Sequence, residues 1–317
     1  MITVLTGGTG GAKFVDGLRR ILSPEELTIV VNTGDDHDWW GLYVSPDLDS
    51  ITYVLAGILS PERGWGVRGD TFHCLQAMQE FGEPSWFSVG DRDLATHLSR
   101  NQLLSRGRTL TEATRIIAEK LGVHSRVLPM SDQRVQTRIQ TPVGELSFEE
   151  YFVKRRYQDP VESVRFDGAS KSKPAPGAVE AITKADAVLI APSNPVTSIG
   201  PILAVPGIRE ALRNTAAKIV AVSPIIGSIA VSGPAVSLMA SQRLSASIAG
   251  IADFYADFLD TLIVHDSDAE TAQALSGNRV DLVSTDILMR TTEDKVRIAN
   301  SALECALPEN AAVKVAS

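Results

Sequence analysis

Short runs of mostly apolar, β-branched residues recur along the chain, and stretches with helical spacing follow them. The runs are Ile2 to Leu5, Leu27 to Asn32, Ala187 to Ala191, Lys218 to Val222 and Thr261 to Val264. They are apolar throughout rather than alternating, as strands are when helices cover both faces of a parallel sheet. Strands that alternate with helices form βαβ units, so the pattern predicts an α/β fold with a doubly wound, mainly parallel sheet.

Two helices have clear boundary signals in the sequence. One is predicted to begin at a capping box formed by Thr109 and Glu112 and to end before Gly122. Another is predicted to begin at Ser45, as N-cap, with Pro46 in its first turn. The apolar face of this second helix is expected to comprise Leu48, Ile51, Leu55 and Leu59.

One long segment interrupts the alternation of strands and helices. Residues 61–123 have a mostly helical pattern, and we expect them to form a helical cap insertion within a single α/β domain that spans residues 1–317. Residues 134–168 contain short strand-like runs and one linking helix. The chain is easily long enough to bury a full hydrophobic interior.

A glycine-rich turn follows the first strand directly and contains Gly8, Thr9, Gly10, Gly11 and Lys13. Glycines let the backbone approach phosphate oxygens, and the helix that follows offers free N–H groups and the positive end of its dipole. The turn lacks the second glycine and the Ser or Thr of a Walker A loop. It also departs from the dinucleotide fingerprint, because Lys13 stands at the third glycine position. We predict a site for a nucleotide diphosphate; a merely tight strand–helix turn is the alternative.

A group of carboxylates follows the second strand. Asp35, Asp36, Asp38, Asp47 and Asp49 all fall within fifteen residues. Open α/β sheets bind ligands at the carboxyl ends of their strands, and magnesium takes one or two carboxylates and completes its shell with phosphates and water. The alternative is that the last two aspartates only favour the helix dipole from a first turn. The number of acids favours a metal or catalytic role for at least one pair.

Hydroxyl and amide side chains follow two later strands in the same way. Ser193, Asn194 and Ser198 lie after the third apolar run, and Ser223 follows the next one. Such groups can bind a diphosphate or a ribose, although Ser, Asn and Pro also set turn geometry without any ligand. Two such loops beside the glycine-rich turn make a shared crevice the better interpretation.

Other polar and aromatic positions leave their role open. Asp91, Arg92 and Asp93 could form a solvated salt-bridge cluster, which is usually worth little. Tryptophans such as Trp39 and Trp86 could stack on a flat substrate, but tryptophans more often simply pack. The histidines show no metal-binding spacing, and no Ser-His-Asp or Cys-His arrangement can be argued from the sequence.

Composition narrows the functional classes. The formal net charge is −8, which argues against a general nucleic-acid binder. Cys74 and Cys305 are the two cysteines, so neither a disulfide framework nor a structural zinc site is expected. No signal peptide is recognised at the start, and no apolar run reaches the length of a membrane span. We expect a cytoplasmic protein without a membrane partner.

Taken together, the motifs resemble the 2-phospho-L-lactate transferase family of coenzyme F-420 biosynthesis over nearly the whole chain. They are the segments 7–13, 31–36, 45–49, 90–97, 128–132 and 191–203. The resemblance implies a Rossmann-like fold, a homodimer and a magnesium-dependent reaction. Members of this family move a phospholactyl or phosphoenolpyruvyl group from a guanosine diphosphate donor to the ribityl hydroxyl of the deazaflavin Fo, and GMP is released.

The resemblance also implies roles for individual residues. The donor diphosphate would be bound by Gly8, Thr9, Gly10, Gly11, Lys13, Ser193, Asn194, Ser198 and Ser223. Mg(II) would be held by Asp35, Asp36, Asp47 and Asp49. Asp49 and Asp36 would be the catalytic residues, and Fo would contact Asp49, Ser88, Asp91 and Arg92. Ser88 departs from some relatives, which carry a lysine there. Neither the general base nor the three-carbon acid of the donor follows from the sequence.

Two other classes remain as alternatives. A paralogous, non-enzymatic group binds nucleotide-sugars as a regulator and has a similar glycine loop. Its members tend to carry a Gly-Ser-Ser run after the paired aspartates, whereas His37, Asp38, Trp39 and Trp40 follow here. An NAD-dependent oxidoreductase is disfavoured by Lys13 and by the lack of a clear acid about 20 residues beyond a complete fingerprint.

Overall fold

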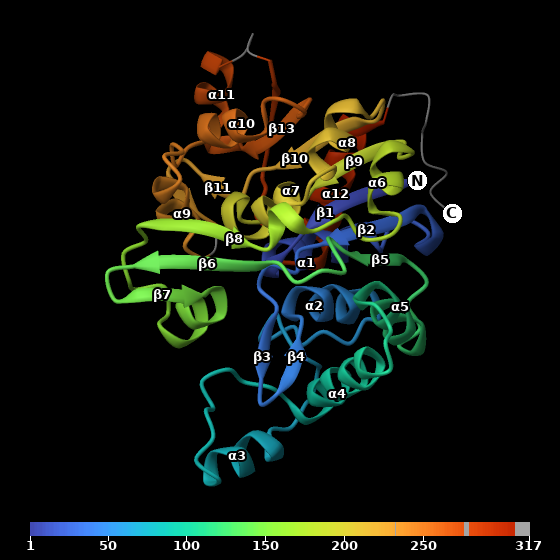
Figure 1. The fold of residues 1–317 in the computed structure, drawn as a ribbon. Helices are drawn as coiled ribbons and strands as arrows, with labels where there is room; N and C mark the ends of the chain where they lie inside the picture. Colours follow the sequence, from blue (N-terminus) through green and yellow to red (C-terminus); the bar gives the residue numbers. More distant parts are fainter. Residues whose placement is uncertain (232, 276–278, 308–317) are drawn as a thin grey trace.

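One parallel sheet forms the middle layer of the molecule (Figure 1). The computed structural model describes residues 1–231, 233–275 and 279–307, and within them seven strands join this sheet in the order β14–β13–β10–β9–β1–β2–β5. The strands are β1 (Ile2–Thr6), β2 (Leu27–Val31), β5 (Arg126–Pro129), β9 (Ala187–Ile190), β10 (Lys218–Val222), β13 (Thr261–His265) and β14 (Asp281–Thr285). All neighbours pair in parallel, which confirms the predicted fold class.

The five predicted runs are the inner strands of this sheet, β13, β10, β9, β1 and β2. The two strands that the sequence did not predict, β5 and β14, are its edges. An edge strand pairs on one side only and needs no continuous apolar run. Consistent with this, the residues of β14 are exposed or only half-buried.

The order of the strands places a switch point beside β1. The chain moves from β1 to β2 on one side of the sheet and returns later to β9 on the other side. In open α/β sheets a ligand site is expected at such a switch point, between the loops that leave the carboxyl ends of the strands. Leu5 of β1 is aligned with both Val30 of β2 and Ile190 of β9, so the three strands end close together.

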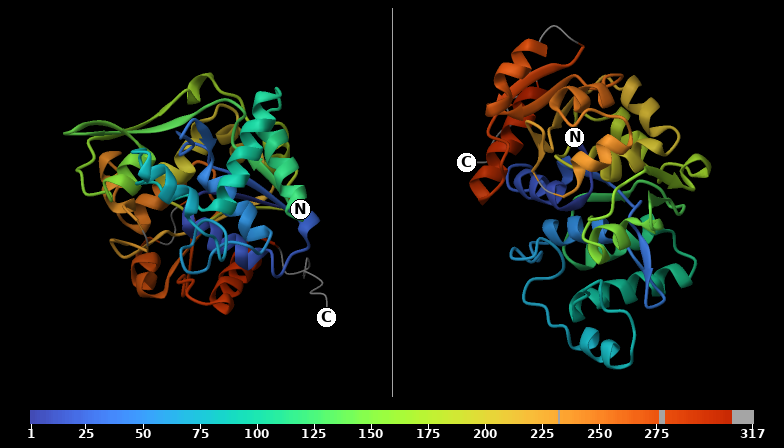
Figure 2. Two further views of the ribbon diagram at one scale, coloured as in Figure 1. Left: turned by 90° about the horizontal axis from the view of Figure 1, so that it is seen from below. Right: turned by 90° about the vertical axis from the view of Figure 1, so that its left-hand side faces the viewer.

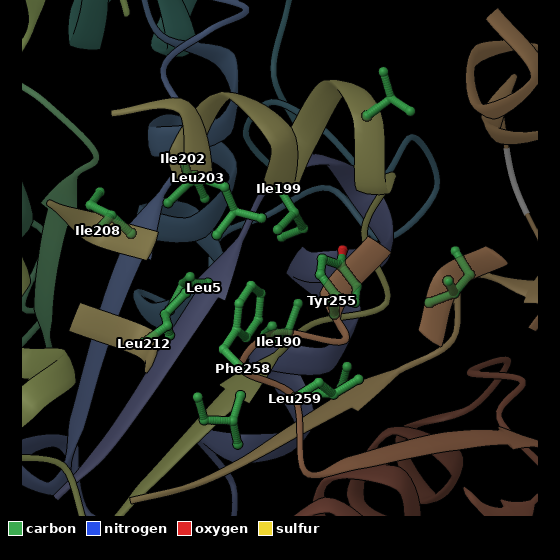
Figure 3. Packing of buried hydrophobic residues seen from close by; sticks show 14 of the residues in the cluster. Leu5, Ile190, Ile199, Ile202, Leu203, Ile208, Leu212, Tyr255, Phe258 and Leu259 are labelled. Atoms are coloured by element: carbon green, nitrogen blue, oxygen red, sulfur yellow. The ribbon is translucent and has the colours of Figure 1, made fainter. Parts of the chain in front are cut away.

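Helices cover both faces of the sheet. Successive side chains of a strand point to opposite faces, so they contribute to a separate hydrophobic core on each face. Ile2 and Val4 of β1 point into one core and Leu5 into the other. The first core is covered by α1 (Gly8–Leu18), α2 (Pro46–Leu55), α5 (Leu110–Lys120) and α12 (Thr292–Ala306). The second is covered by α6 (Ala178–Thr183), α7 (Gly200–Ala204), α8 (Ile208–Asn214), α9 (Ala235–Ser241) and α10 (Ile248–Tyr255). Figure 3 shows Leu5 and Ile190 packed in this second core with Tyr255 and Phe258.

The two predicted helix boundaries are found, although one uses a different contact. In α5 the Thr109 hydroxyl accepts a hydrogen bond from Glu112 N at 3.2 Å, as the capping box requires, and Gly122 follows with φ +76°. Helix α2 begins at Pro46. Ser45 is the N-cap residue, as predicted, but its hydroxyl donates to Asp36 Oδ2 at 2.6 Å and makes no capping hydrogen bond. On the predicted apolar face, Leu48 and Ile51 are buried, Leu55 is half-buried and Leu59 lies beyond the end of the helix.

Two helices of the segment 61–123 project from the body of the molecule. They are α3 (His73–Glu80) and α4 (Asp91–Ser105), which lie with the hairpin of β3 (His37–Trp39) and β4 (Leu42–Val44) below the sheet in Figure 1. Figure 2 shows the same separation from the side. The third helix of that segment, α5, packs on the sheet through Leu110 and Ala118.

Residues 134–168 contain the predicted short strands and helical turn, and the strands pair into a second, smaller sheet. Its strands β7 (Gly144–Ser147), β6 (Gln136–Thr141) and β8 (Ser163–Asp167) are antiparallel, and the π-helical turn covers Glu150–Lys154. The remaining elements are short: Pro24–Glu26, Ala169–Lys171, Pro195–Ile199, β11 (Ile225–Ile226), β12 (Ile229–Ala230), Asp266–Asp268 and α11 (Ala269–Leu275). In the described part of the chain, no helix combines the length and apolar character needed to span a membrane.

Candidate functional site

Three loops meet where β1, β2 and β9 end. The turn after β1 is joined to the loop after β9, because the Ser193 hydroxyl donates to Gly7 O at 2.7 Å. The loop after β2 is joined to the same segment, because Asn32 Nδ2 donates to Thr197 O at 3.3 Å. The three loops predicted to share a site are therefore in direct contact with one another. They lie at the switch point of the sheet.

The glycines of the turn are required by close contacts within the protein. A Cβ atom at Gly10 would overlap the carbonyl oxygen of Pro192, and one at Gly11 would overlap the Thr6 hydroxyl. Gly8 adopts φ +67°, a conformation that favours glycine. Tight packing alone therefore explains these glycines. The case for a bound phosphate depends instead on the N-terminus of α1, whose first amides lack helical partners.

Asp47 reaches this N-terminus from α2. Its Oδ1 accepts a hydrogen bond from Gly8 N at 2.7 Å, and its Oδ2 accepts one from Asn32 Nδ2 at 3.0 Å. The same amide nitrogen donates to Asp35 Oδ2 at 2.9 Å. Asn32 therefore holds the carboxylates of Asp35 and Asp47 side by side, next to the glycine-rich turn.

Asp36 is buried beside this pair and is held by the hairpin. Its Oδ2 accepts hydrogen bonds from the Tyr43 hydroxyl at 2.7 Å and from Ser45 at 2.6 Å. Its Oδ1 is buried and has no hydrogen-bond partner among the described residues. This oxygen is therefore available to a ligand.

A fourth carboxyl group, Glu149, joins the set from the segment that follows β7. It is buried, and its charge interacts with those of Asp47 and Asp36. Glu149 is not among the residues predicted for the site, since Phe148-Glu149-Glu150 resembles the ordinary acidic start of a helical turn. No local signal could have identified it, because the second sheet brings it to the site.

Burial disfavours the ionisation of all four carboxyl groups, and neighbouring carboxylates add to this for Asp35 and Glu149. Burial, followed by the charge of Asp47, raises the pKa of Asp35 well above its ordinary value and that of Glu149 to about 8. Burial also raises the pKa of Asp36 to about 8 and that of Asp47 to about 6. Crowded, desolvated carboxylates of this kind gain most from a cation that neutralises them.

Asp49 lies two residues after Asp47 but on another side of the same helical turn. Its carboxylate forms a two-pronged ion pair with Arg100 of α4, in which Nη1 lies 3.1 Å from Oδ2 and Nη2 contacts Oδ1. Burial alone would raise the pKa of Asp49, but the Arg100 charge and a contact with His97 hold it below its ordinary value. Asp49, Asp93 and His97 could together approach one metal ion. The Arg100 cation in their midst makes this group a poor cation site.

Residues 90–93 connect the starts of α3 and α4 through hydrogen bonds. The Asp91 carboxylate accepts hydrogen bonds from His73 N at 3.1 Å and Cys74 N at 2.9 Å, at the start of α3. Asp70 does the same for α4, since it accepts from Arg92 N at 2.8 Å and from Asp93 N. Each helix is thus capped by an aspartate that precedes or begins the other.

The other predicted site residues differ in their burial and in the contacts that they make. Ser198 is buried beside Gly8, Lys13 is exposed on α1, and Thr9 is exposed at the start of that helix. The Asn194 side chain accepts from Val196 N at 2.9 Å and so caps the turn that follows. The Ser223 hydroxyl is engaged with the backbone of Ile225, while Ser88 precedes α4 and Arg92 lies in the first turn of that helix. The ligand roles of these residues remain predictions.

The aromatic side chains beside the hairpin mainly pack against one another. Trp39 is buried, and its ring lies 4.8 Å from that of Trp86 and 5.7 Å from that of Phe87, measured between centroids. The Lys154 ammonium lies 5.7 Å from the centre of the Trp86 ring. These contacts fix the hairpin against the segment that precedes α4.

Comparison with known proteins gives matches over nearly the whole chain. A family model described as 2-phospho-L-lactate transferase CofD matches residues 2–303. The chain is 40% identical over 309 residues to a protein from Methanocaldococcus jannaschii named 2-phospho-L-lactate transferase, and the match covers 96% of this chain and 97% of that protein. It is 39% identical over 311 residues to a protein from Streptomyces coelicolor named phosphoenolpyruvate transferase, with 96% and 98% covered.

A solved structure has the same fold at low sequence identity. It is the crystal structure of a UPF0052 family member from Bacillus halodurans, which superimposes with a TM-score of 0.65 at 19% identity. The match covers 96% of this chain and 98% of that chain. It supports the Rossmann-like architecture and says nothing about the chemistry of the site.

Proposed function

This chain belongs to the 2-phospho-L-lactate transferase family, and we propose that it transfers a phospholactyl or phosphoenolpyruvyl group from a guanosine diphosphate donor to Fo. The reaction would serve coenzyme F-420 biosynthesis and would release GMP. One observation carries the proposal: Asp47 lies against the N-terminus of α1, in contact with Gly8 N, within a group of buried carboxyls. A helix N-terminus beside carboxylates is suited to a diphosphate bound together with a cation.

We assign the donor diphosphate to the crevice between the loops that follow β1 and β9. The amides of Gly8 to Gly11 lie at the positive end of α1, and Lys13 adds a charge one turn further along the helix. The Ser193 hydroxyl already contacts Gly7, and Ser198 lies beside Gly8, so both belong to the same wall. Guanine recognition is taken from the family and not from this geometry.

The buried carboxyl groups fit magnesium. Their donors are carboxylate oxygens, which magnesium prefers, and Asn32 holds Asp35 and Asp47 side by side. Among the described residues Asp36 Oδ1 has no hydrogen-bond partner, and the charge of Glu149 interacts with those of Asp47 and Asp36. Of the predicted ligands, Asp35, Asp36 and Asp47 would hold the ion, while Asp49 is already neutralised by Arg100. Magnesium, when bound, would neutralise charge on the phosphates during transfer.

The remaining residues would position the acceptor. The ribityl hydroxyl oxygen of Fo forms a bond to the phosphorus that carries the three-carbon acid and releases its proton to water, the bond from that phosphorus to the bridging oxygen breaks, and GMP leaves. In-line transfer of this kind needs mainly positioning and charge stabilisation. We assign Asp36 and Asp49 to orientation of the hydroxyl, with Ser88, Asp91 and Arg92 on the acceptor side. A cytoplasmic homodimer is the assembly that we expect.

The proposal is tested by incubating the pure protein with Fo, magnesium and a phospholactyl or enolpyruvyl guanosine diphosphate. GMP release together with a phosphorylated deazaflavin would support it, and comparing the two donors would identify the three-carbon acid. Absence of GMP release, with tight binding of a UDP-sugar in calorimetry, would instead favour the nucleotide-sugar-binding regulator.

A further inference from the structure

Consecutive residues of α4 are linked to the two carboxyl groups to which the transfer is assigned, one directly and one through Tyr43. Arg100 pairs with Asp49 of α2, and Asn101 pairs with the backbone of Tyr43, whose hydroxyl donates to Asp36. We propose that Arg100 and Asn101 are positioning residues, through which α4 fixes the orientation of the Asp49 and Asp36 carboxylates. The inference rests on the proposed transferase function.

The contact with Arg100 fixes the orientation of the Asp49 carboxylate plane as well as its distance from the guanidinium. Both terminal nitrogens of the guanidinium meet both oxygens of Asp49, and a planar fork of this kind holds a carboxylate in one orientation. Arg100 Nη1 also lies 3.4 Å from His97 Nδ1, which in turn lies 3.4 Å from Asp49 Oδ2. The Arg100 side chain is only 2% exposed, so little water competes for these contacts.

Stability alone is a weak reason for such a pair. Burying two charges costs desolvation energy, and apolar side chains of similar volume often stabilise a core as well or better. The same position on α4 could therefore pack on α2 without any charge. A requirement for one orientation of Asp49 explains the arginine more directly.

Asn101 acts on the hairpin in a comparable way. Its Oδ1 accepts from Tyr43 N at 3.0 Å, and its Nδ2 donates to Tyr43 O at 3.2 Å, so it pairs with this residue as a neighbouring strand would. The Tyr43 hydroxyl then donates to Asp36 Oδ2 at 2.7 Å, and the other oxygen of Asp36 has no hydrogen-bond partner in the part of the chain that the structure describes. Displacing α4 would therefore shift both carboxylates together.

The test compares Arg100→Gln, Arg100→Lys and Asn101→Ala with Arg106→Gln, a control at the exposed end of the same helix. We expect Arg100→Gln to lower kcat about 100-fold, the scale of a small misplacement at a reacting centre, with GDP affinity within about twofold of the wild type. Arg100→Lys should recover part of kcat, because it restores the charge without the fork. Asn101→Ala should lower kcat about tenfold, on the same argument applied to one contact.

Calorimetry with GDP shows whether a variant still binds the donor nucleotide, and thermal unfolding shows whether it is folded. Together they distinguish a loss of positioning from misfolding. A folded Arg100→Gln variant with kcat within threefold of the wild type would overturn the inference, as would equal loss of kcat and GDP affinity. If Arg100→Gln does not fold, Arg100→Lys and the paired variant Asp49→Asn/Arg100→Gln decide. The paired variant should be no slower than Asp49→Asn alone, since Arg100 acts through Asp49.

Failure of the proposed function gives a different result, namely a wild-type protein that releases no GMP. The crystal structure of Arg100→Gln then decides the inference by itself. A rotated Asp49 carboxylate would support it, and an unmoved carboxylate would overturn it.

Discussion

At the scale of single residues, two aspartates of one helical turn have opposite electrostatic states. Asp47 faces the glycine-rich turn and other carboxyl groups, and burial raises its pKa to about 6. Asp49 is equally buried, but Arg100 lowers its pKa. Residues two apart on a helix point in different directions, so each carboxylate meets different neighbours. Only Asp49 carries a built-in counter-charge.

Replacing Asp49 by Asn should lower turnover by about two to three orders of magnitude, as expected when a preorganised charge is lost from a reacting centre. The fold should persist, because Asn is nearly isosteric and still accepts a hydrogen bond from Arg100, but the Arg100 charge loses its buried partner and the unfolding free energy should fall by about 3–5 kcal/mol. GMP release and thermal unfolding measure the two effects. Asp38→Asn, in a half-exposed ion pair with Arg134, is the matched control and should be close to the wild type. Unchanged turnover in Asp49→Asn would remove Asp49 from the site.

Lys13→Ala should mainly weaken donor binding. The side chain is exposed on α1, so the loss should be about tenfold in Kd, equivalent to about 1.4 kcal/mol, and should shrink as salt is added. Titration calorimetry with GDP measures it. Lys184→Ala, in an exposed pair on α6, is the control. Equal GDP affinity in Lys13→Ala and the wild type would exclude a contact with the diphosphate.

At the scale of elements, the start of α1 and the loop after β9 share one packing surface. Gly10 lies against the carbonyl of Pro192, and Ser193 holds the carbonyl of Gly7. The glycines therefore set how closely two loops of the crevice approach each other. A change in this spacing would alter both the stability of the fold and the width of the donor site.

Gly10→Ala should test this spacing. The added methyl group would overlap Pro192 O, which is backbone and cannot rotate away, so we expect a loss of about 1–3 kcal/mol in unfolding free energy. GDP binding should weaken in the same variant. Chemical denaturation and calorimetry measure the two quantities. Thr9→Ser, at an exposed position of the same turn, should leave stability unchanged. A fully stable Gly10→Ala variant would show that the two loops can separate freely.

At the scale of the whole molecule, the buried carboxyl groups link stability to pH. The folded-state pKa values of Asp36 and Glu149 are about 8 and that of Asp47 about 6, above their ordinary values. Between about pH 4 and pH 8 the folded protein therefore keeps protons that the unfolded chain has released. Because the folded state binds more protons in this window, its stability falls as the pH rises.

Magnesium should reverse this trend. A cation needs ionised carboxylates, so it should stabilise the protein more at pH 8 than at pH 5.5. Without metal, Tm should be lower at pH 8 than at pH 5.5 by at least about 4 °C, since 1 kcal/mol shifts Tm by roughly 2 °C in a chain of this size. Scanning fluorimetry in EDTA, in MgCl2 and in NaCl of equal ionic strength measures it. A magnesium effect that is the same at both pH values would argue against these carboxyls as ligands.

The sequence by itself determined what depends on neighbouring residues. Inner strands need continuous apolar runs and a helix start needs its cap, so β1, β2, β9, β10, β13 and the capping box of α5 were all predictable. The glycine-rich turn, with Asp35, Asp36 and Asp47, could be placed near one crevice because parallel strands end at the same edge of a sheet. The edge strands β5 and β14 were not predicted. The residues of β14 are exposed or half-buried, and the buried run of β5 covers only Val127 to Pro129, which is too short to indicate a strand by itself.

Tertiary structure alone decided which charges meet. Arg100 follows Asp49 by 51 residues in the sequence, and the packing of the folded chain brings the two side chains into contact. Glu149 joins the group of buried carboxyls from the segment that follows β7 of the second sheet. The Ser45 hydroxyl bonds to Asp36 and not to the backbone of α2. Such contacts depend on how elements pack, which spacing along the chain does not encode. Electrostatic energies depend on distance and burial in space, so the state of each carboxylate follows from the fold.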